Sequence, residues 1–280
     1  MILWFRFPAL LYVILSALCL FPPLANAGEP PPKALRDLNP DRPGSTTSAT
    51  TIDVGHFEIE VEALNYSRLT TRTSDAKSTT TQISLANTNI RVGLTNISEF
   101  SIAWIPYQTQ TEDVTGSPKQ SLSGVGDVNI RYKQNVLGNE GGSVAWAFMP
   151  GVKLPTNSGG LGNKKLEPTL MLPLSVDLST NWNVSFTPEF DVRSNSANGN
   201  FHTEFISPIT VDRHLTDKYD GYFEYVVHSG DEQGTNAGTY VGLGGSAKFT
   251  QDLQLDIGCT FGVNESTPSY NPFAGISVRF

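Results

Sequence analysis

Residues 57–63 read Phe57-Glu58-Ile59-Glu60-Val61-Glu62-Ala63, with an apolar residue at every odd position and a glutamate at every even one. Successive side chains of a β-strand point to opposite faces, so this stretch predicts a strand with one apolar face and one charged face. The same alternation recurs at residues 182–190 and 253–261. No segment offers a convincing helical period, so we expect an all-β fold.

Twelve segments carry this pattern, and most are long enough to cross a bilayer as tilted strands. They cover residues 55–67, 80–94, 98–107, 124–137, 143–154, 165–178, 182–192, 201–215, 219–229, 239–249, 253–263 and 272–280. Short turns at 95–97, 138–142, 179–181, 216–218 and 250–252 alternate with long connections at 68–79, 108–123, 155–164, 193–200, 230–238 and 264–271. This arrangement predicts a transmembrane antiparallel up-and-down β-barrel of about 12 strands, with both ends of the domain in the periplasm and the long connections outside.

A soluble β-sandwich or a lipocalin-like barrel would also alternate. Charge and aromatic placement favour the membrane, because a dry core could not hold so many charges and a wet lumen could. We expect the lumen to be lined by Glu58, Glu60, Glu62, Asp127, Arg131, Lys133, Glu189, Glu204, Glu224, Asp256 and Arg279. Aromatic residues at strand ends suit two membrane girdles, and those we expect there are Phe57, Trp104, Tyr132, Trp146, Trp182, Tyr219, Phe249 and Phe280.

The N-terminus predicts an export signal followed by an arm. Arg6 precedes an apolar run, and Ala25-Asn26-Ala27 offers a cleavage site, so residues 1–27 predict a cleaved signal peptide; a retained anchor helix is the alternative. Residues 28–54 are rich in Pro, Ser and Thr and lack periodicity, which predicts an extended arm. The arm either plugs the barrel mouth or hangs free in the periplasm. We expect residues 55–280 to form the barrel.

Composition argues against several classes of function. The formal net charge is −8 and the pI is about 5.0, which does not suit a nucleic-acid partner. The four histidines lack metal-ligand spacing, and His228 and Ser229 should point to opposite faces of one strand. We therefore expect no catalytic residues, no metal and no cofactor, and the protein should not be an enzyme.

Two polar or irregular features leave alternatives open. The ladder Glu58, Glu60 and Glu62 is either a wall paired with basic residues such as Arg279 and Lys133 or a cation-favouring pore surface. Four prolines fall near the middle of four successive strands, where each removes a backbone donor; they are Pro150, Pro173, Pro188 and Pro208. They are either four tolerated bulges or a lateral opening in the wall.

Four short motifs add a family resemblance. They are Asn39-Pro40-Asp41-Arg42-Pro43, the run from Gly124 to Lys133, the run from Pro150 to Thr156, and the run from Phe273 to Phe280, which ends on an aromatic residue. On these motifs the chain resembles the meta-pathway phenol-degradation proteins of bacterial outer membranes. Asn157-Ser158 stand where the family would have a glycine, so we expect that loop to be built differently.

The resemblance implies a channel or facilitator for passive uptake of small molecules, with aromatic or apolar compounds as one class. The alternatives are a non-transporting barrel, used as an adhesin or a structural element, and an outer-membrane lipid hydrolase. The expected location is the outer membrane of a Gram-negative bacterium. The expected partners are its lipids and, through Phe280, its assembly machinery.

Overall fold

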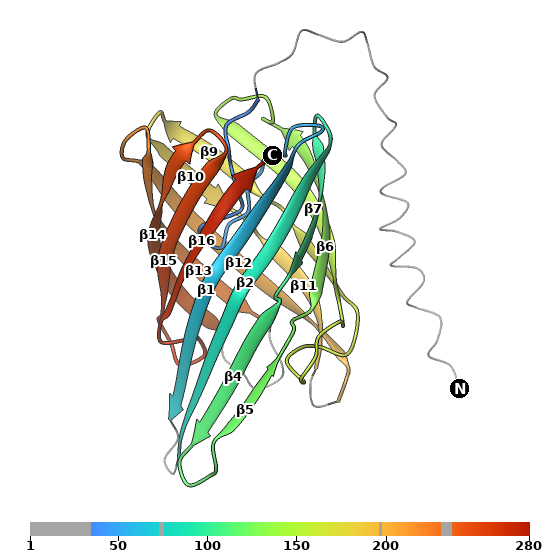
Figure 1. The fold of residues 1–280 in the computed structure, drawn as a ribbon, viewed down its shortest axis with the longest axis vertical. Coiled ribbons are helices and arrows are strands. Elements are labelled where there is room, and N and C mark those ends of the chain that lie inside the picture. Colours follow the sequence, from blue (N-terminus) through green and yellow to red (C-terminus); the bar gives the residue numbers. More distant parts are fainter. Residues whose placement is uncertain (1–34, 73–75, 196–197, 231–236) are drawn as a thin grey trace, which may run out of the picture. The chain divides into compact units, whose positions relative to one another are not determined.

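The computed structural model describes residues 35–280 except 73–75, 196–197 and 231–236, so the expected signal peptide lies outside the described residues. Sixteen strand segments form one barrel (Figure 1). They are β1 (Phe57–Arg72), β2 (Lys77–Thr95), β3 (Ser98–Trp104), β4 (Tyr107–Val114), β5 (Gln120–Gly124), β6 (Val128–Leu137), β7 (Val144–Leu154), β8 (Glu167–Met171), β9 (Leu174–Ser179), β10 (Trp182–Phe186), β11 (Glu189–Ser194), β12 (Phe201–His214), β13 (Tyr219–Ser229), β14 (Gly238–Thr250), β15 (Leu253–Gly262) and β16 (Asn271–Arg279). No helix within the described ranges is long and apolar enough to span a membrane.

The sixteen segments make twelve strands, because four strands are each broken in two. β3 and β4 both pair with β2, and β8 and β9 both pair with β7. β5 and β6 form the fourth strand in the same way, and β10 and β11 the seventh. All pairs are antiparallel, and β1 pairs with both β2 and β16. The closed twelve-stranded barrel expected from the sequence is confirmed.

The barrel closes where the first strand meets the last. Phe57 N donates to Phe280 O at 3.1 Å, and Phe280 N donates back to Phe57 O at 2.8 Å. Their rings stack with centroids 5.0 Å apart. A backbone group left unpaired in lipid costs several kcal/mol, so this seam is a requirement of the fold.

Burial alternates along the strands as the sequence pattern predicts. On β13 the side chains of Tyr222, Glu224 and Val226 are buried, whereas Phe223 and Tyr225 between them are exposed. The apolar face therefore lies outside and the mixed polar face inside. Of the expected girdle residues, six are exposed: Phe57, Trp146, Trp182, Tyr219, Phe249 and Phe280; Trp104 and Tyr132 are half-buried.

Two of the expected long connections are wrong. β1 and β2 extend through most of 68–79, leaving 73–76, and β4 and β5 occupy most of 108–123, leaving 115–119. These hairpins project past the rest of the barrel (Figure 1). The strands of these hairpins are rich in Ser, Thr and Gln and have no apolar face, because a sheet with water on both sides needs none. The alternation of apolar and polar residues therefore gives no signal there.

The four prolines lie on neighbouring strands without opening the backbone ladder. Pro150 and Pro208 stand inside β7 and β12, whereas Pro173 and Pro188 stand in the breaks of the strands between them. The carbonyl groups of Pro173, Pro188 and Pro208 accept backbone hydrogen bonds from Ala147, Leu172 and Thr187 at 2.9–3.2 Å. Each break is thus bridged from the neighbouring strand.

We predict that trypsin added to intact cells cuts after Lys119, in the exposed β4–β5 turn, if the long connections face outside. Lys218 is a matched control, since it lies in the exposed turn between β12 and β13 at the other end of the barrel. It should be cut only after the outer membrane is permeabilised. Mass spectrometry of the fragments distinguishes the two cleavage sites. Cleavage at Lys218 in intact cells would show that the barrel has the opposite orientation in the membrane.

Candidate functional site

A segment of chain fills one side of the lumen. Residues 36–54, which we call the arm, enter at the end of the barrel that carries the short turns. There Arg36 donates to Asn96 O, and its own carbonyl accepts from Arg279. The arm then crosses the lumen and returns to Val54, which forms a backbone bridge with Gly93 on β2. Figure 1 shows it as the blue trace inside the strands.

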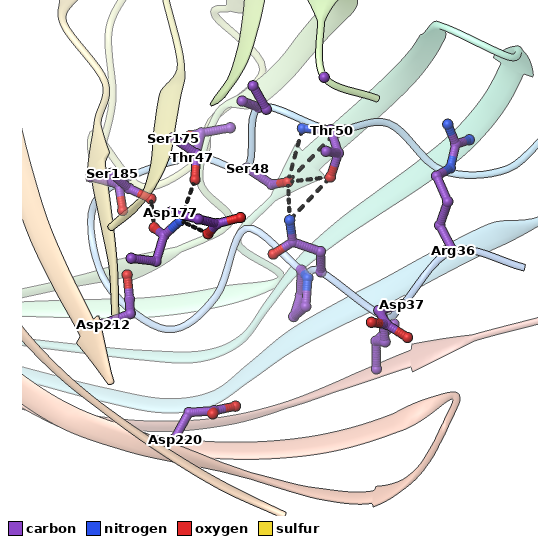
Figure 2. Close-up of a pocket in the computed structure, with 18 of the residues that line it drawn as sticks. Arg36, Asp37, Thr47, Ser48, Thr50, Ser175, Asp177, Ser185, Asp212 and Asp220 are labelled. Atoms are coloured by element: carbon purple, nitrogen blue, oxygen red, sulfur yellow. Dashed lines mark hydrogen bonds between the residues drawn. The ribbon is translucent and has the colours of Figure 1, made fainter. Parts of the chain in front are cut away.

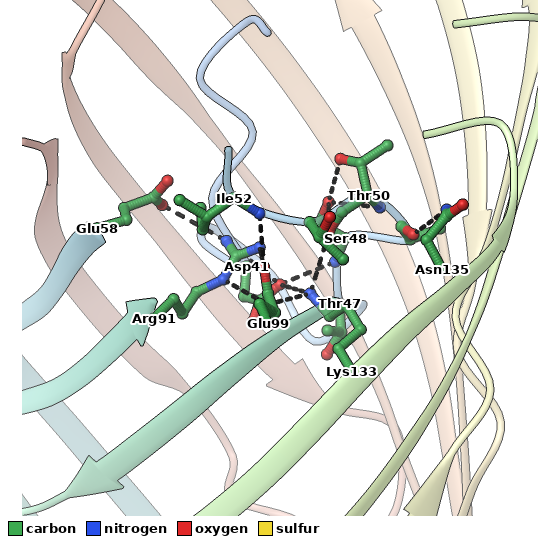
Figure 3. Close-up of polar contacts among 12 residues, drawn as sticks. Asp41, Thr47, Ser48, Thr50, Ile52, Glu58, Arg91, Glu99, Lys133 and Asn135 are labelled. Carbon is green, nitrogen blue, oxygen red and sulfur yellow. Dashed lines mark hydrogen bonds and ion pairs between the residues drawn. The ribbon is translucent and has the colours of Figure 1, made fainter. Parts of the chain in front are cut away.

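The arm contacts an ion cluster centred on Arg91 of β2 (Figure 3). Arg91 is fully buried; its Nε lies 2.9 Å from Glu99 Oε1, and its Nη1 lies 3.1 Å from Glu60 Oε1 and 3.5 Å from Glu58 Oε1. Arg91 Nη1 also donates to the Asn39 carbonyl of the arm at 3.2 Å. Part of the glutamate ladder is therefore paired with this arginine.

Asp41 joins the arm to the same cluster. Its Oδ1 lies 3.2 Å from Lys133 Nζ and 3.7 Å from Arg91 Nη1. Lys133 Nζ also lies 2.9 Å from Glu99 Oε1. Burial acts to raise the pKa of Asp41, but the attraction of Arg91 and Lys133 outweighs it and holds the pKa below its usual value of 3.8. Asp41 is therefore ionised at every pH above that value.

Arg42 holds the arm at the closing seam. Its guanidinium lies 3.0 Å from Glu62 on β1 and 2.7 Å from Asp256 on β15. Between them, on β16, Gly275 leaves the space that the guanidinium occupies: a Cβ there would come within 2.5 Å of Arg42 Nη2. Glu62, the third glutamate of the ladder, is thus paired with Arg42 of the arm, near the junction of the first and last strands.

The tip of the arm reaches the opposite wall. Ser45 N donates to Glu224 on β13 at 2.8 Å, and Thr46 Oγ1 donates to Thr210 on β12 at 3.0 Å. Thr47 N donates at 3.0 Å to Thr187, in the break between β10 and β11. On the return path Asn135 of β6 donates to the Ala49 carbonyl at 2.8 Å. Polar contacts from many strands therefore fix the arm as a loop across the lumen.

A vestibule of about 560 Å³ remains between the arm and one part of the wall (Figure 2). Its wall residues come from β7, β9, β10, β12, β13, β14 and β15 and are mostly hydroxyl, amide and carboxylate side chains; they include Ser175, Asp177, Asn183, Ser185, Asp212, Asp220 and Lys248. The turn between β6 and β7 also lines it, which places the vestibule at the short-turn end. Farther along β7, Ala147 and Met149 are fully buried.

The remaining expected lumen residues take other positions. Asp127 lies in the break between β5 and β6, where its carboxylate accepts from Asn157 N, Asn157 Nδ2 and Asn163 N at 2.7–3.0 Å. It anchors the connection between β7 and β8, which is where the sequence departs from the family pattern. Arg279 pairs with Asp252 at 2.7 Å, not with the glutamate ladder.

A second charged group lies toward the long-loop end. Glu204 Oε1 lies 2.9 Å from His202 Nε2, and its Oε2 lies 2.9 Å from His228 Nε2. Arg193 lies 3.2 Å from Glu167 and 3.8 Å from Glu204. Of the other expected lumen residues, Glu189 accepts from Thr169 at 3.2 Å, and Arg131 shows no ion pair within the described ranges.

Sequence reasoning missed Arg91 and Glu99, which are at the centre of the arm's contacts. Glu99 shares its strand face with Ser101 and Ala103, and Arg91 follows Asn87 and Asn89, so neither extends a visible run of charges. Strand register is what would have identified them. Arg91, on β2, pairs with Glu58 on β1 and with Ser101 on β3. That register follows only from the strand pairing.

Comparisons with known proteins agree with the fold. The family model described as "Putative MetA-pathway of phenol degradation" matches residues 40–280. The COG4313 outer membrane channel from Pseudomonas putida F1 superposes with a TM-score of 0.64 at 14% identity, covering 85% of this chain and 100% of that one. The translocator domain of autotransporter NalP from Neisseria meningitidis gives 0.55 at 11% identity, covering 81% and 90%. No curated protein sequence matches significantly. The chain has the fold of outer-membrane barrels.

We predict that Arg42→Met destabilises arm docking by about 3–5 kcal/mol, because Glu62 and Asp256 are left as buried charges without a partner. Thermal unfolding and protease access to the arm would measure the loss. Adding Glu62→Gln and Asp256→Asn should recover much of the stability, since no stranded charge remains. Lys119→Met is the control, because it breaks an exposed 3.9 Å pair worth about 0–1 kcal/mol. An Arg42→Met protein as stable as the control would contradict this account of docking.

Proposed function

The chain belongs to the family described as "Putative MetA-pathway of phenol degradation", and on that basis we propose that it is an outer-membrane channel for passive uptake of small molecules, with the arm as its plug. The family description points to aromatic compounds as one class of solute. The structural neighbour from Pseudomonas putida F1 is itself described as an outer membrane channel, which supports the same activity here.

The observation that carries the proposal is the polar lumen with its vestibule. A barrel used for adhesion or as a structural element needs only a filled interior, as small barrels have. Here about 560 Å³ stays open beside the arm, and the arm is held by hydrogen bonds and ion pairs. Buried apolar residues of the arm are few; Leu38, Ala49 and Ile52 are the buried hydrophobic ones within the described residues. Such a segment can dissociate from the lumen wall without exposing a large apolar surface.

The location is part of the same proposal. Export would remove residues 1–27, and the barrel would then insert with its exposed aromatic residues at the membrane interfaces. Phe280 is 57% exposed at the chain end, which suits its expected role as a signal to the assembly machinery. We assign no catalytic role to His228, which lies 2.9 Å from Glu204.

We predict that removing residues 36–50 raises single-channel conductance in planar bilayers, because the loop across the lumen is lost. Asp113→Asn is the control, since it changes one charge on the exposed β4–β5 hairpin, away from the arm and the vestibule. Heat-modifiable migration on a denaturing gel should show that the truncated barrel still folds. If a folded truncated barrel is silent, the channel proposal is wrong and a non-transporting barrel is favoured.

A lateral route for apolar compounds is a second candidate. It is favoured by the four prolines on neighbouring strands, with two strand breaks among them. Proline has no backbone N–H, so it donates no hydrogen bond to the next strand. The backbone at Pro173 and Pro188 is therefore joined to its neighbours only through the proline carbonyl groups, which accept hydrogen bonds from Ala147 and Leu172. An apolar solute leaving there would enter the membrane without crossing the polar vestibule.

A disulfide across this wall should abolish such a route. Leu174 and Phe186 are directly paired between β9 and β10 beside the breaks, so both would be replaced by cysteine in a chain with Cys259→Ser. We predict that the crosslink lowers uptake of an apolar aromatic solute by cells and that reduction restores it. A crosslink between the paired residues Val241 and Phe261 of β14 and β15 is the control. Undiminished uptake in the β9–β10 variant would rule out the lateral route.

A further inference from the structure

The vestibule extends to a side of the barrel with which the arm makes no hydrogen bond or ion pair among the described residues. Among the described residues, the hydrogen bonds and ion pairs of the arm go to β1, β2, β3, β6, β12, β13, β14, β15 and β16, to Thr187, and to the short turns that follow β2 and β6. Within the part of the chain that the structure describes, none goes to β7, β8, β9 or β10. Ala145, Ser175, Asp177 and Asn183 of those strands line the vestibule instead. The space beside the arm at the short-turn end is therefore bounded in part by these strands.

The lining suits hydrophilic solutes. No phenylalanine, tyrosine or tryptophan is among the described residues that line the vestibule. Hydroxyl, amide and carboxylate groups can replace the water around a polar solute, whereas an apolar ring gains nothing from contact with them. Figure 2 shows Asp177, Ser185 and Asp212 of the wall around the same cavity as Thr47 and Ser48 of the arm.

The charge that remains in the vestibule after pairing is negative. The cations on its lining are satisfied elsewhere: Arg36 lies 3.0 Å from Asp53, and Arg42 is held by Glu62 and Asp256. Lys248 lies 3.7 Å from Asp220, which also contacts His214.

Among the described residues, three carboxylates of the lining have no such cation: Asp37 on the arm, and Asp177 and Asp212 on the wall. Asp177 accepts at 2.7 Å from Asn183, whose amide is neutral. Asp212 makes no hydrogen bond or ion pair within the described ranges, although it lines the vestibule. Charges of one sign in a cavity with low-dielectric walls reinforce one another and concentrate the opposite ion.

We propose that the vestibule is the periplasmic mouth of the channel and selects small hydrophilic cations, with Asp177 and Asp212 setting that preference. The proposal rests on the channel function and names its class of solute. It differs from the expectation of apolar aromatic solutes, which would need the lateral route.

The first test measures reversal potentials in a potassium chloride gradient with the full-length chain and with the arm-releasing Arg42→Met variant. We expect potassium to be favoured over chloride, and Asp177→Asn with Asp212→Asn to lower the permeability ratio by about fivefold. Asp113→Asn removes one carboxylate from the exposed β4–β5 hairpin and should leave the ratio unchanged. Choline should permeate better than acetate in the parent chain, and this difference should shrink in the double variant.

A second measurement locates the path. Ser185→Cys in a chain with Cys259→Ser places one thiol on the vestibule wall, and a cationic thiosulfonate should lower both conductance and cation preference there. Ser117→Cys in the β4–β5 turn is the control. A conducting channel that is unselective or anion-selective, or that responds neither to the two aspartate substitutions nor to modification of the Ser185→Cys variant, overturns the proposal and leaves the channel function standing. If the full-length chain, the Arg42→Met variant and the folded chain without residues 36–50 are all silent, the channel function itself fails.

Discussion

Charge inside the lumen must be compensated, and the interior is arranged around that requirement. Glu58, Glu60 and Glu99 are buried to 1% exposure or less, a position that an unpaired carboxylate could not hold without a cost of several kcal/mol. Arg91, on the strand between them, lies within 3.5 Å of all three, and Lys133 adds a second cation 2.9 Å from Glu99. The lumen is therefore a network of ion pairs, and the arm takes part in it.

The arm, our proposed plug, is also a structural partner of the wall. Its Arg42 bridges β1 and β15 across the position where the barrel closes, and Gly275 on β16 keeps the space for it. Removing one member of such a group leaves the others stranded, whereas removing all the charges leaves none. This asymmetry makes the docked state specific without a large apolar contact, and a contact of that kind can be reversed.

The same polarity divides the routes through the molecule. The vestibule offers carboxylates and hydroxyls, which favours hydrophilic solutes, while the proline-rich wall between β7 and β12 is the region where an apolar solute would have to leave. These two routes belong to different parts of one barrel and can be tested separately. The family description is compatible with either route, because it names a degradation pathway and not a route through the barrel.

The sequence by itself determined the barrel. Alternation such as Phe57-Glu58-Ile59-Glu60 depends on neighbours along one strand, so the strands, their number and the short turns could be predicted from it. The long hairpins β1–β2 and β4–β5 could not, because water on both faces removes the alternation. The partners of the lumen charges were decided by the tertiary structure alone. Arg91 meets Glu58 through strand register, and Arg42 meets Asp256 across 214 residues, distances that no local pattern encodes.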